Sequence, residues 1–366
     1  MKKCIEFCSI ASDFPGSFIK CMHKLMRESQ KENMKIEFVF PYEAKDKIWC
    51  KNLMKETKVY FISAKKASLN LKTYVEIYKI LKNNNYDIIH SHYESFDINL
   101  FIMKKILKLK SRLIFHLHDC PLEHLNDVGI FKSLYYQLKY ILFTKNVEII
   151  AINKKNEETV KKFSKKCAYT KLLYNGISFD DLKYNNSIST IPTFITLGWD
   201  FYVKGDDLIL KAADILFKKG YKFKLIINGN DTTFQQIKKF LKCDIPKYIE
   251  FQQPVIDRND FFNKGNIFLQ ASRNETFSFG VCEASYAGKV VICSNIPGMS
   301  WSFYLPNVNT FETESYESLA CEMEKYLKNP SLFSFDKEFV RNEIMNNFSD
   351  EIWIKNMIEI YSKGSR

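Results

Sequence analysis

Short apolar runs alternate with longer segments whose apolar residues recur at helical spacing along most of the chain. The runs are rich in β-branched and aromatic residues, which favour strands. In the first half they are residues 4–10, 35–40, 59–62, 87–90, 113–117, 148–152 and 171–174. This alternation predicts parallel strands joined by crossover helices.

A polar segment separates this series from a second one. Residues 180–192 have no apolar periodicity and end in Pro192, which predicts an interdomain linker. The alternation resumes with runs at 194–197, 223–227, 249–251, 267–269 and 290–293. We therefore expect an α/β protein with two Rossmann-like domains, residues 1–180 and 181–349.

The last segment is predicted to be a helix. Ile352, Trp353, Met357 and Ile358 recur at helical spacing, and Asp350 is suited to cap the amino end. Residues 350–366 are therefore assigned to a C-terminal helix that crosses back to the first domain.

Composition indicates an ordinary globular protein. Apolar residues make up 46% of the 366 positions, enough for two cores. The ten cysteines are scattered without Cys-x-x-Cys pairs, which favours reduced thiols over a disulfide framework. Residues 1–10 do not resemble a signal sequence, and no apolar run approaches the length of a membrane span. We expect a cytoplasmic location.

The charge balance favours an anionic partner. Lysine and arginine number 54 against 42 acidic residues, which gives a formal charge of +12. The basic helical segments 20–35 and 103–110 mix lysines with apolar residues, as a peripheral membrane surface does, although a solvated lysine face fits equally well. Zinc-finger and RNA-binding motifs are missing from the sequence, so nucleic acid is not expected.

Two glutamates near the carboxyl end, Glu275 and Glu283, stand out by their context. The spacing itself is uninformative, because Glu314 and Glu322 repeat it in an ordinary amphipathic segment. Glu275, however, falls in the loop after a predicted strand, and Glu283 lies in the helix that follows. Ligands bind at such strand ends, and a helix amino terminus attracts phosphate.

Several further segments occur with this pair in a fixed order. They are Phe14-Pro15-Gly16-Ser17, residues 86–92, residues 115–119, residues 174–177, Leu197-Gly198-Trp199 with Lys204-Gly205, and residues 275–283 followed by Ile296-Pro297-Gly298. In these motifs nearly the whole chain resembles the retaining GT-B glycosyltransferases of family four. The resemblance implies two Rossmann-like domains facing a cleft, with the acceptor on the first domain and a nucleotide sugar on the second.

The resemblance also implies a donor site. Glu283 matches the residue that holds the ribose hydroxyls, Glu275 the residue that contacts the donor sugar, and Lys204 the lysine that meets the diphosphate. The alternatives are a helix-surface acid for Glu283 and a helix-capping acid for Glu275. The donor-binding set is Gly16, Gly198, Lys204, Glu275, Ser278, Phe279, Gly280 and Glu283, of which Lys204 and Glu275 are also assigned to catalysis.

One position departs from the family pattern. The family usually has an arginine after Gly198, where this sequence has Trp199. Two interpretations remain open: Arg273 supplies the missing positive charge, or Trp199 stacks on a substrate.

All six histidines precede residue 125, and four of them end predicted strands. His118 matches the family histidine near the anomeric centre and is assigned to catalysis, whereas His90 and His92 are assigned to the acceptor pocket. His90 and His92 point to one face of a strand and could bind metal, yet no third ligand or Asp-x-Asp triplet accompanies them. We expect no metal, and Asp206-Asp207 is interpreted as a helix start.

The implied function is retaining, metal-independent sugar transfer in bacterial surface polysaccharide or glycolipid synthesis. The donor is a nucleotide sugar, with UDP favoured, which acts as substrate so that no cofactor is needed. The acceptor is a saccharide or a lipid-linked saccharide, which favours a peripheral position on the inner face of the cell membrane. The alternatives are a sugar-nucleotide epimerase of the same architecture and a catalytically inactive binding module.

Overall fold

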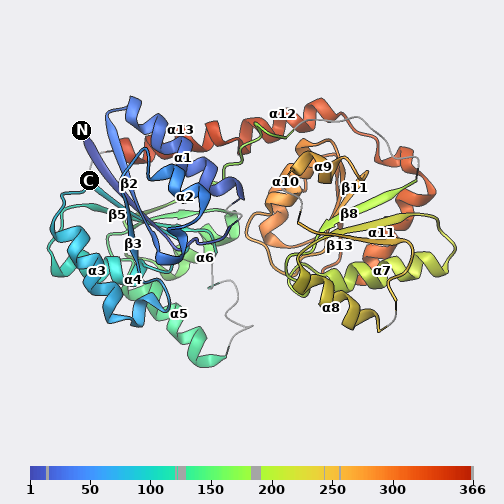
Figure 1. Cartoon of the computed structure of the whole chain (residues 1–366), viewed down its shortest axis with the longest axis horizontal. Helices are drawn as coiled ribbons and strands as arrows, with labels where there is room; N and C mark the ends of the chain where they lie inside the picture. Colours follow the sequence, from blue (N-terminus) through green and yellow to red (C-terminus); the bar gives the residue numbers. More distant parts are fainter. Residues whose placement is uncertain are drawn as a thin grey trace. The chain divides into compact units, whose positions relative to one another are not determined.

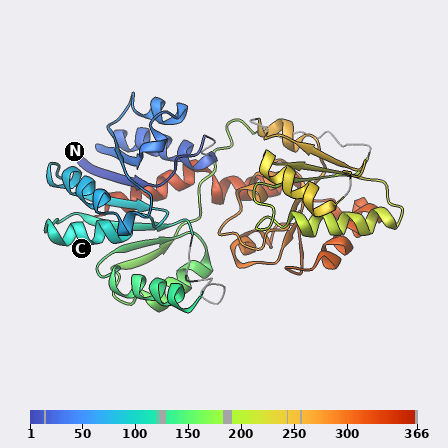
Figure 2. The same ribbon diagram turned by 60° about the horizontal axis from the view of Figure 1, so that its bottom comes forward.

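The structure is a computed structural model that describes residues 1–13, 16–119, 122, 129–182, 191–242, 244–254 and 257–363. The chain folds into two compact units, which we call unit 1 (Met1–Ser178 with Asp350–Arg366) and unit 2 (Phe179–Ser349). Each unit is a parallel sheet with helices on both faces (Figures 1 and 2). Phe14, Pro15 and linker residues 183–190 lie outside the described residues.

Unit 1 is built on a seven-stranded sheet of order β3-β2-β1-β4-β5-β6-β7. The strands are β1 (Lys2–Cys8), β2 (Met34–Pro41), β3 (Val59–Ile62), β4 (Ile88–His92), β5 (Arg112–Leu117), β6 (Glu148–Ala151) and β7 (Tyr169–Leu172). The helices are α1 (Gly16–Lys31), α2 (Ile48–Leu53), α3 (Leu71–Lys82), α4 (Asp97–Ile106), α5 (Ile130–Leu142), α6 (Lys154–Phe163) and α13 (Asp350–Ser362), with short 3-10 turns at Tyr42–Ala44 and Ala67–Leu69. The predicted parallel strands and crossover helices are confirmed here. The basic segment 103–110 is not helical throughout, because α4 ends at Ile106 and Lys108 has a left-handed backbone (φ 51°).

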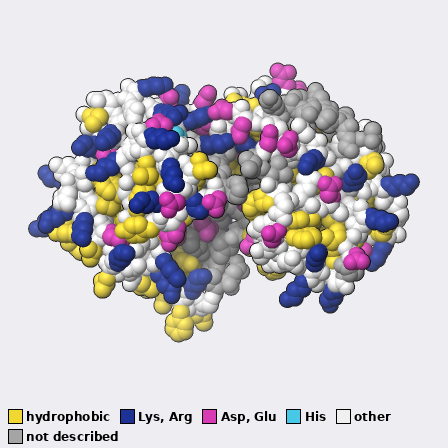
Figure 3. All heavy atoms as spheres, viewed as in Figure 1, with side chains coloured by type: hydrophobic (Ala, Val, Ile, Leu, Met, Phe, Trp, Pro, Cys, Tyr) yellow, Lys and Arg dark blue, Asp and Glu magenta, His cyan; other side chains and the backbone are white. Residues whose placement is uncertain are grey.

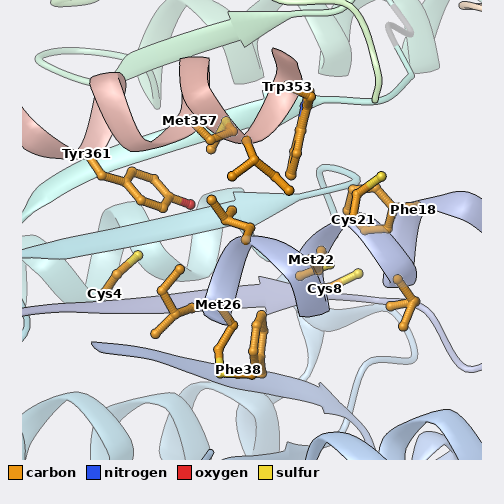
Figure 4. Close-up of a cluster of buried hydrophobic side chains, with 14 of the residues drawn as sticks. Cys4, Cys8, Phe18, Cys21, Met22, Met26, Phe38, Trp353, Met357 and Tyr361 are labelled. Atoms are coloured by element: carbon orange, nitrogen blue, oxygen red, sulfur yellow. The ribbon is translucent and has the colours of Figure 1, made fainter. Parts of the chain in front are cut away.

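Helices cover both faces of this sheet, which explains why its strands are nearly continuous apolar runs. On one face, residues of α1, α2 and α13 pack over Cys4 and Cys8 of β1 (Figure 4). On the other face, residues of α3, α4, α5 and α6 pack over Ile5 and Phe7. The alternation of side chains along β1 therefore feeds two separate cores.

The predicted C-terminal helix is confirmed as α13, which belongs to unit 1. Asp350 opens the helix, and its carboxylate accepts a hydrogen bond from Lys24 Nζ at 2.6 Å. A Cβ at Gly176 would lie 2.6 Å from Trp353 Cβ, so only glycine lets the chain pass this close. Near the other end, Arg112 donates to the Ile360 carbonyl at 2.8 Å. The helix is thus fixed along its length.

Unit 2 is built on a six-stranded sheet of order β10-β9-β8-β11-β12-β13. The strands are β8 (Thr193–Leu197), β9 (Lys224–Asn228), β10 (Ile249–Gln252), β11 (Ile267–Gln270), β12 (Val290–Ser294) and β13 (Val308–Phe311). The helices are α7 (Asp206–Lys218), α8 (Asp231–Leu241), α9 (Arg258–Phe262), α10 (Phe279–Tyr286), α11 (Tyr316–Lys328) and α12 (Lys337–Phe348), with 3-10 turns η4 (Pro297–Ser302) and η5 (Pro330–Phe333). Sequence reasoning missed β13, which pairs in parallel with β12. Within the described part of both units, no helix is long and apolar enough to cross a bilayer.

Candidate functional site

The strand order of unit 2 reverses between β8 and β11, since β9 lies on the other side of β8. Loops that leave the carboxyl ends of two such strands run in opposite directions and open a crevice for ligands. Lys204 lies in the loop after β8, and Glu275 lies in the loop after β11. The structure brings these two predicted residues together, with Lys204 Nζ 2.5 Å from Glu275 Oε1.

Glu275 is held by neighbours within its own loop and strand. Its Oε1 accepts hydrogen bonds from Ser272 Oγ at 3.0 Å and Gln270 Nε2 at 3.1 Å. Its side chain is 13% exposed, so the carboxylate is oriented but still accessible. The helix-capping interpretation of Glu275 is wrong, because Ser278 caps α10 by accepting from Val281 N at 3.4 Å.

The loop that carries Glu275 is fixed by close backbone packing. A Cβ at Gly298 would lie 1.7 Å from the Glu275 carbonyl oxygen, so only glycine fits there. Trp301 Nε1 donates to the Phe277 carbonyl at 2.5 Å. On the Lys204 side, Gly205 has φ +70° and would place a Cβ 2.1 Å from the Ala271 carbonyl oxygen. These contacts position both charged groups without help from a ligand.

The amino end of α10 lies directly after this loop. Ser278 has a left-handed backbone with φ 60°, a conformation that L-residues seldom adopt. Gly280 sits close to β11, where a Cβ would meet Phe268 Cζ at 2.9 Å. The predicted residues Ser278, Phe279 and Gly280 therefore form the first turn of a helix beside the Lys204–Glu275 pair. The unpaired N–H groups of such a turn favour an anion.

Glu283 lies within α10, beyond its first turn. It is paired with a residue that sequence reasoning missed. Arg258 Nη1 in α9 donates to Glu283 Oε1 at 2.6 Å, and Arg258 also pairs with Asp181. The Glu283 side chain is 12% exposed, so the helix-surface interpretation is wrong. Burial lowers the pKa of Arg258, but the charge of Glu283 outweighs it and the net pKa is raised. No motif marks Arg258, because only the fold brings α9 against α10.

Asp206 is a second site residue that the sequence did not reveal. It begins α7 as predicted, but it is completely buried, and neither carboxyl oxygen has a hydrogen-bond partner among the described residues. Its Oδ2 would lie 2.6 Å from a Cβ at Gly198, so the glycine makes room for this carboxyl. Burial, and then the charge of Asp207, raise the pKa of Asp206 to about 8.

The structure argues against one interpretation of Trp199. Arg273 makes a bidentate pair with Asp207 at 2.8 and 2.9 Å, and its Nε contacts Glu314 at 2.8 Å. Its Nη1 also donates to the Tyr202 carbonyl at 2.5 Å. Arg273 is thus committed to structural contacts, and the idea that it replaces the family arginine is wrong. Trp199 itself is 42% exposed, and its stacking on a substrate stays a prediction.

Gly16, which sequence reasoning placed with the donor, belongs to unit 1. It begins α1 with φ +63°, and a Cβ there would meet nothing within 4 Å. Glycine is therefore favoured at this turn by the left-handed backbone conformation and not by a lack of room for a side chain.

The four predicted strand-end histidines form one cluster in unit 1. His90 and His92 of β4 have ring centroids 4.1 Å apart, and His116 of β5 and His118 just beyond it are 4.2 Å apart. His92 Nδ1 lies 3.0 Å from His118 Nε2. Parallel pairing of β4 with β5 places His92 beside His116.

The histidine cluster is buried, and this burial affects both the protonation of the rings and the access of a ligand to them. His90, His92 and His116 are fully buried and His118 is 6% exposed. Burial first, and then neighbouring histidine charges, lower the pKa of His90, His116 and His118, so these rings are neutral at pH 7. This arrangement offers no atom of His90 or His92 to an acceptor, and their acceptor-binding role stays a prediction.

The expectation that no third possible metal ligand accompanies His90 and His92 is wrong. One ligand atom from each of His90, His92 and His116 lies within 4.8 Å of the others. The signal was available, because His116 and His118 repeat on β5 the spacing of His90 and His92 on β4. Sequence reasoning missed it by treating each strand alone.

Comparison with known proteins agrees with this architecture. Residues 180–344 match the family described as glycosyl transferases group 1. An O-antigen biosynthesis glycosyltransferase of Escherichia coli, WclY, is 26% identical over 226 residues, which is 58% of this chain and 62% of that protein. The chain thus spans less than two thirds of the length of this curated relative.

Solved structures share the fold over almost the whole chain. A sucrose-phosphate synthase from Thermosynechococcus elongatus superposes with a TM-score of 0.80 at 13% identity, covering 99% of this chain and 98% of its own. HepE of Anabaena, solved with UDP-glucose, gives a TM-score of 0.76 at 13% identity and covers 99% and 100%. A glycosyltransferase from Rickettsia africae gives 0.74 at 15% identity, with 98% and 97% covered. The chain therefore has the GT-B fold, and its residues 180–344 are similar to the glycosyl transferases group 1 family.

Proposed function

We propose that the protein is a retaining glycosyltransferase that takes a sugar from a nucleoside diphosphate donor, with UDP favoured. The observation that carries the proposal is the Lys204–Glu275 pair at the β8–β11 switch point, next to the first turn of α10. A cation, a carboxylate and a helix amino terminus in one crevice match the needs of a sugar diphosphate. The group 1 family match and the UDP-glucose complex of HepE support the same donor class.

Each group has a distinct task in this proposal. Negative charge grows on the diphosphate as the glycosidic bond breaks, and the Lys204 ammonium with the α10 N–H groups stabilises it. Glu275 accepts hydrogen bonds from sugar hydroxyls and holds the anomeric carbon in place. The positive charge comes from the protein, so we propose transfer without a metal at the diphosphate.

Glu283 is the proposed ribose ligand. Its Oε1 accepts a hydrogen bond from Arg258 at 2.6 Å, which orients the carboxylate that we assign to the ribose hydroxyls. Asp206 retains a proton near pH 7 because its pKa is about 8, so it adds no negative charge beside Gly198.

His118 is the proposed group at the sugar end of the reaction. Its neutral ring accepts or donates a hydrogen bond without adding charge. The acceptor oxygen bonds to the anomeric carbon on the face from which the diphosphate leaves, so the configuration is retained. The proton of the acceptor hydroxyl passes to the leaving phosphate. The proposed acceptor is a saccharide or lipid-linked saccharide bound on unit 1.

A surface of unit 1 fits the proposed membrane partner. Helix α5 exposes an apolar stripe: Ile130, Phe131, Leu134, Leu138, Ile141 and Leu142, with Phe131 92% exposed (Figure 3). Exposed lysines occur on α5 and on α6, which packs against α5, and they include Lys132, Lys155 and Lys162. Apolar side chains flanked by lysines bind anionic bilayer surfaces, which would bring the protein to lipid-linked acceptors on the inner face of the membrane.

A nucleotide panel tests the donor assignment. Thermal unfolding of the native chain and of Glu283→Ala is followed with UDP, GDP and ADP, without added metal, and with Glu317→Ala as a surface control. A ligand at a hundred times its Kd adds about 2.7 kcal/mol, which shifts the transition by a few degrees. We expect one nucleotide to stabilise the native chain and the control but not Glu283→Ala. Stabilisation by none of them would reject the transferase and leave the inactive binding module; nucleotide binding followed by epimerisation of the free donor sugar would favour the epimerase.

A further inference from the structure

We propose that the buried histidine cluster of unit 1 binds one divalent transition-metal ion of the zinc class through His90, His92 and His116. This site belongs to unit 1, whereas the proposed donor groups belong to unit 2, and the proposal does not depend on the proposed function. The ion holds β1, β4, β5 and α13 together and orients His118.

The three rings converge from adjacent strands. Their ligand atoms lie within 4.8 Å of one another, and all three side chains are fully buried. His90 and His92 share a face of β4 because they are two residues apart, and His116 stands beside His92 in the register of β5. Imidazole nitrogen is a preferred ligand of zinc and of its neighbours in the transition series.

The cluster leaves polar atoms without partners, which a core of hydrogen-bonded histidines does not explain. Among the described residues, both ring nitrogens of His116, and Nε2 of His90 and of His92, have no hydrogen-bond partner. A buried polar group without a partner is destabilising, because it has lost its hydrogen bonds to water. A metal ion accepts a lone pair from each ring and removes this destabilisation.

A carboxylate completes the ligand set. Glu6 of β1 is fully buried, and its Oε2 also has no hydrogen-bond partner among the described residues. This oxygen lies 3.5 Å from His92 Nε2. Bonds of about 2.0–2.1 Å in a tetrahedral zinc site place neighbouring ligand atoms about 3.3 Å apart. The observed separation is therefore close to one edge of such a site.

Tyr361 of α13 sets the protonation of His90 for this role. The Tyr361 hydroxyl donates its proton to Glu6 Oε1 at 2.7 Å. Towards His90 Nδ1, which lies 2.5 Å away, the hydroxyl oxygen must therefore act as the acceptor. His90 then carries its proton on Nδ1 and its lone pair on Nε2, the atom that has no partner. Metal-binding histidines are commonly fixed in this way by a second hydrogen bond.

The site also reaches the residue assigned to catalysis. His92 Nδ1 lies 3.0 Å from His118 Nε2. When His92 binds the ion through Nε2, its proton resides on Nδ1 and is donated to His118 Nε2. His118 is then a neutral ring with its own proton on the opposite nitrogen. The metal in this proposal is structural and positions His118.

The test measures metal in the untagged full chain, purified without chelator, by inductively coupled plasma mass spectrometry. We expect about one zinc-class ion per chain in the native protein and in His23→Asn, whose histidine pairs with Glu56 outside the cluster. His116→Asn should lose the ion. Tyr361→Phe keeps the ring and the packing but removes the hydroxyl, so metal affinity should fall about 10–100-fold.

A second readout covers the case in which His116→Asn does not fold. The native chain is refolded with Co²⁺, whose visible absorption bands report tetrahedral nitrogen and oxygen ligands, and Zn²⁺ should abolish the bands by competition. A native chain that carries no metal as purified and gains no Co²⁺ bands would overturn the proposal. An ion that persists at full occupancy in folded His116→Asn would overturn it too.

Discussion

Lys204 Nζ lies 2.5 Å from Glu275 Oε1, although the two residues are far apart in the chain and belong to loops after different strands. The pair is preformed because Gly205 and Gly298 let the two loops pack closely against neighbouring backbone. A donor diphosphate would replace Glu275 as the ion-pair partner of Lys204. Glu275 would still be held by hydrogen bonds from Ser272 and Gln270.

Lys204→Met should remove charge stabilisation of the leaving diphosphate while leaving the fold intact. By analogy with the loss of one transition-state donor, we expect kcat to fall by about 100–1000-fold. UDP release from the donor, with and without acceptor, measures this loss. Lys218→Met, an exposed lysine that pairs with Asp214 on the same unit, is the matched control and should retain full activity. Equal losses in both variants would contradict the role of Lys204.

Glu283 and Arg258 should act as one unit in nucleotide binding. Glu283→Ala should cost about 2–3 kcal/mol of binding free energy, the value of hydrogen bonds to a charged group. Arg258→Ala should cost less, because the carboxylate remains but is no longer oriented at 2.6 Å from the guanidinium. Calorimetric titration with the nucleotide measures both, and the double variant should be no weaker than Glu283→Ala alone. Additive losses would show that Arg258 acts elsewhere.

Gly298→Ala should disturb the loop that carries Glu275. The added Cβ would meet the Glu275 carbonyl oxygen at 1.7 Å, so the backbone must shift, and we expect unit 2 to lose about 1–3 kcal/mol. Scanning calorimetry measures the change. Gly129→Ala has nothing within 4 Å of the new Cβ and serves as control. A Gly298→Ala chain as stable and as active as the native one would refute this tight packing.

The pKa of Asp206 predicts a pH-dependent stability. The pKa of Asp206 is about 8 in the folded chain, whereas an ordinary aspartate has a pKa of 3.8. Between these two values the folded state therefore binds more protons than the unfolded state. Stability should therefore fall as pH rises through that window, by up to about 1.4 kcal/mol per pH unit. Asp206→Asn removes the ionisable group. The free energy of unfolding, measured in urea from pH 5 to 8.5, should therefore depend less on pH in the variant than in the native chain. Identical profiles would indicate that Asp206 is ionised in the native chain.

The apolar stripe of α5 should govern binding to anionic bilayers. Phe131→Ser with Leu134→Ser removes exposed side chains without touching the core, so stability should change little while vesicle binding falls severalfold. Co-sedimentation with vesicles containing anionic lipid measures the loss. Leu332→Ser in unit 2, 72% exposed, is the control. Binding that survives the double substitution would place the membrane contact on another surface.

The sequence predicted the sheet elements well where apolar runs were continuous, because strands buried on both faces leave an unmistakable pattern. It missed β13, whose Asn309 and Thr310 interrupt the apolar run at the sheet edge. It also placed Glu275 in a loop after a strand, and the family resemblance assigned Lys204 to the same donor site. It could not reveal Arg258 or the burial of Asp206, because these depend on how α9 and α7 pack, which local patterns do not encode.

The histidines show a different limit. Their spacing on each strand was visible, but a metal site requires two strands in register and a carboxylate from a third. Strand order supplies both, since β4 lies between β1 and β5. Placing the predicted strands side by side before interpreting each motif would have shown His116 as a possible third ligand beside His90 and His92.

Sugar transfer itself is tested most directly by mass spectrometry of reactions that contain a UDP-sugar, extracted bacterial membrane lipids as acceptors and the native chain, with Lys204→Met in parallel. We predict a lipid-linked product heavier by one sugar, with the anomeric configuration of the donor, that forms with the native chain and not with Lys204→Met. A donor that stays intact with the native chain, or that changes its sugar without transfer to any acceptor, would contradict the account.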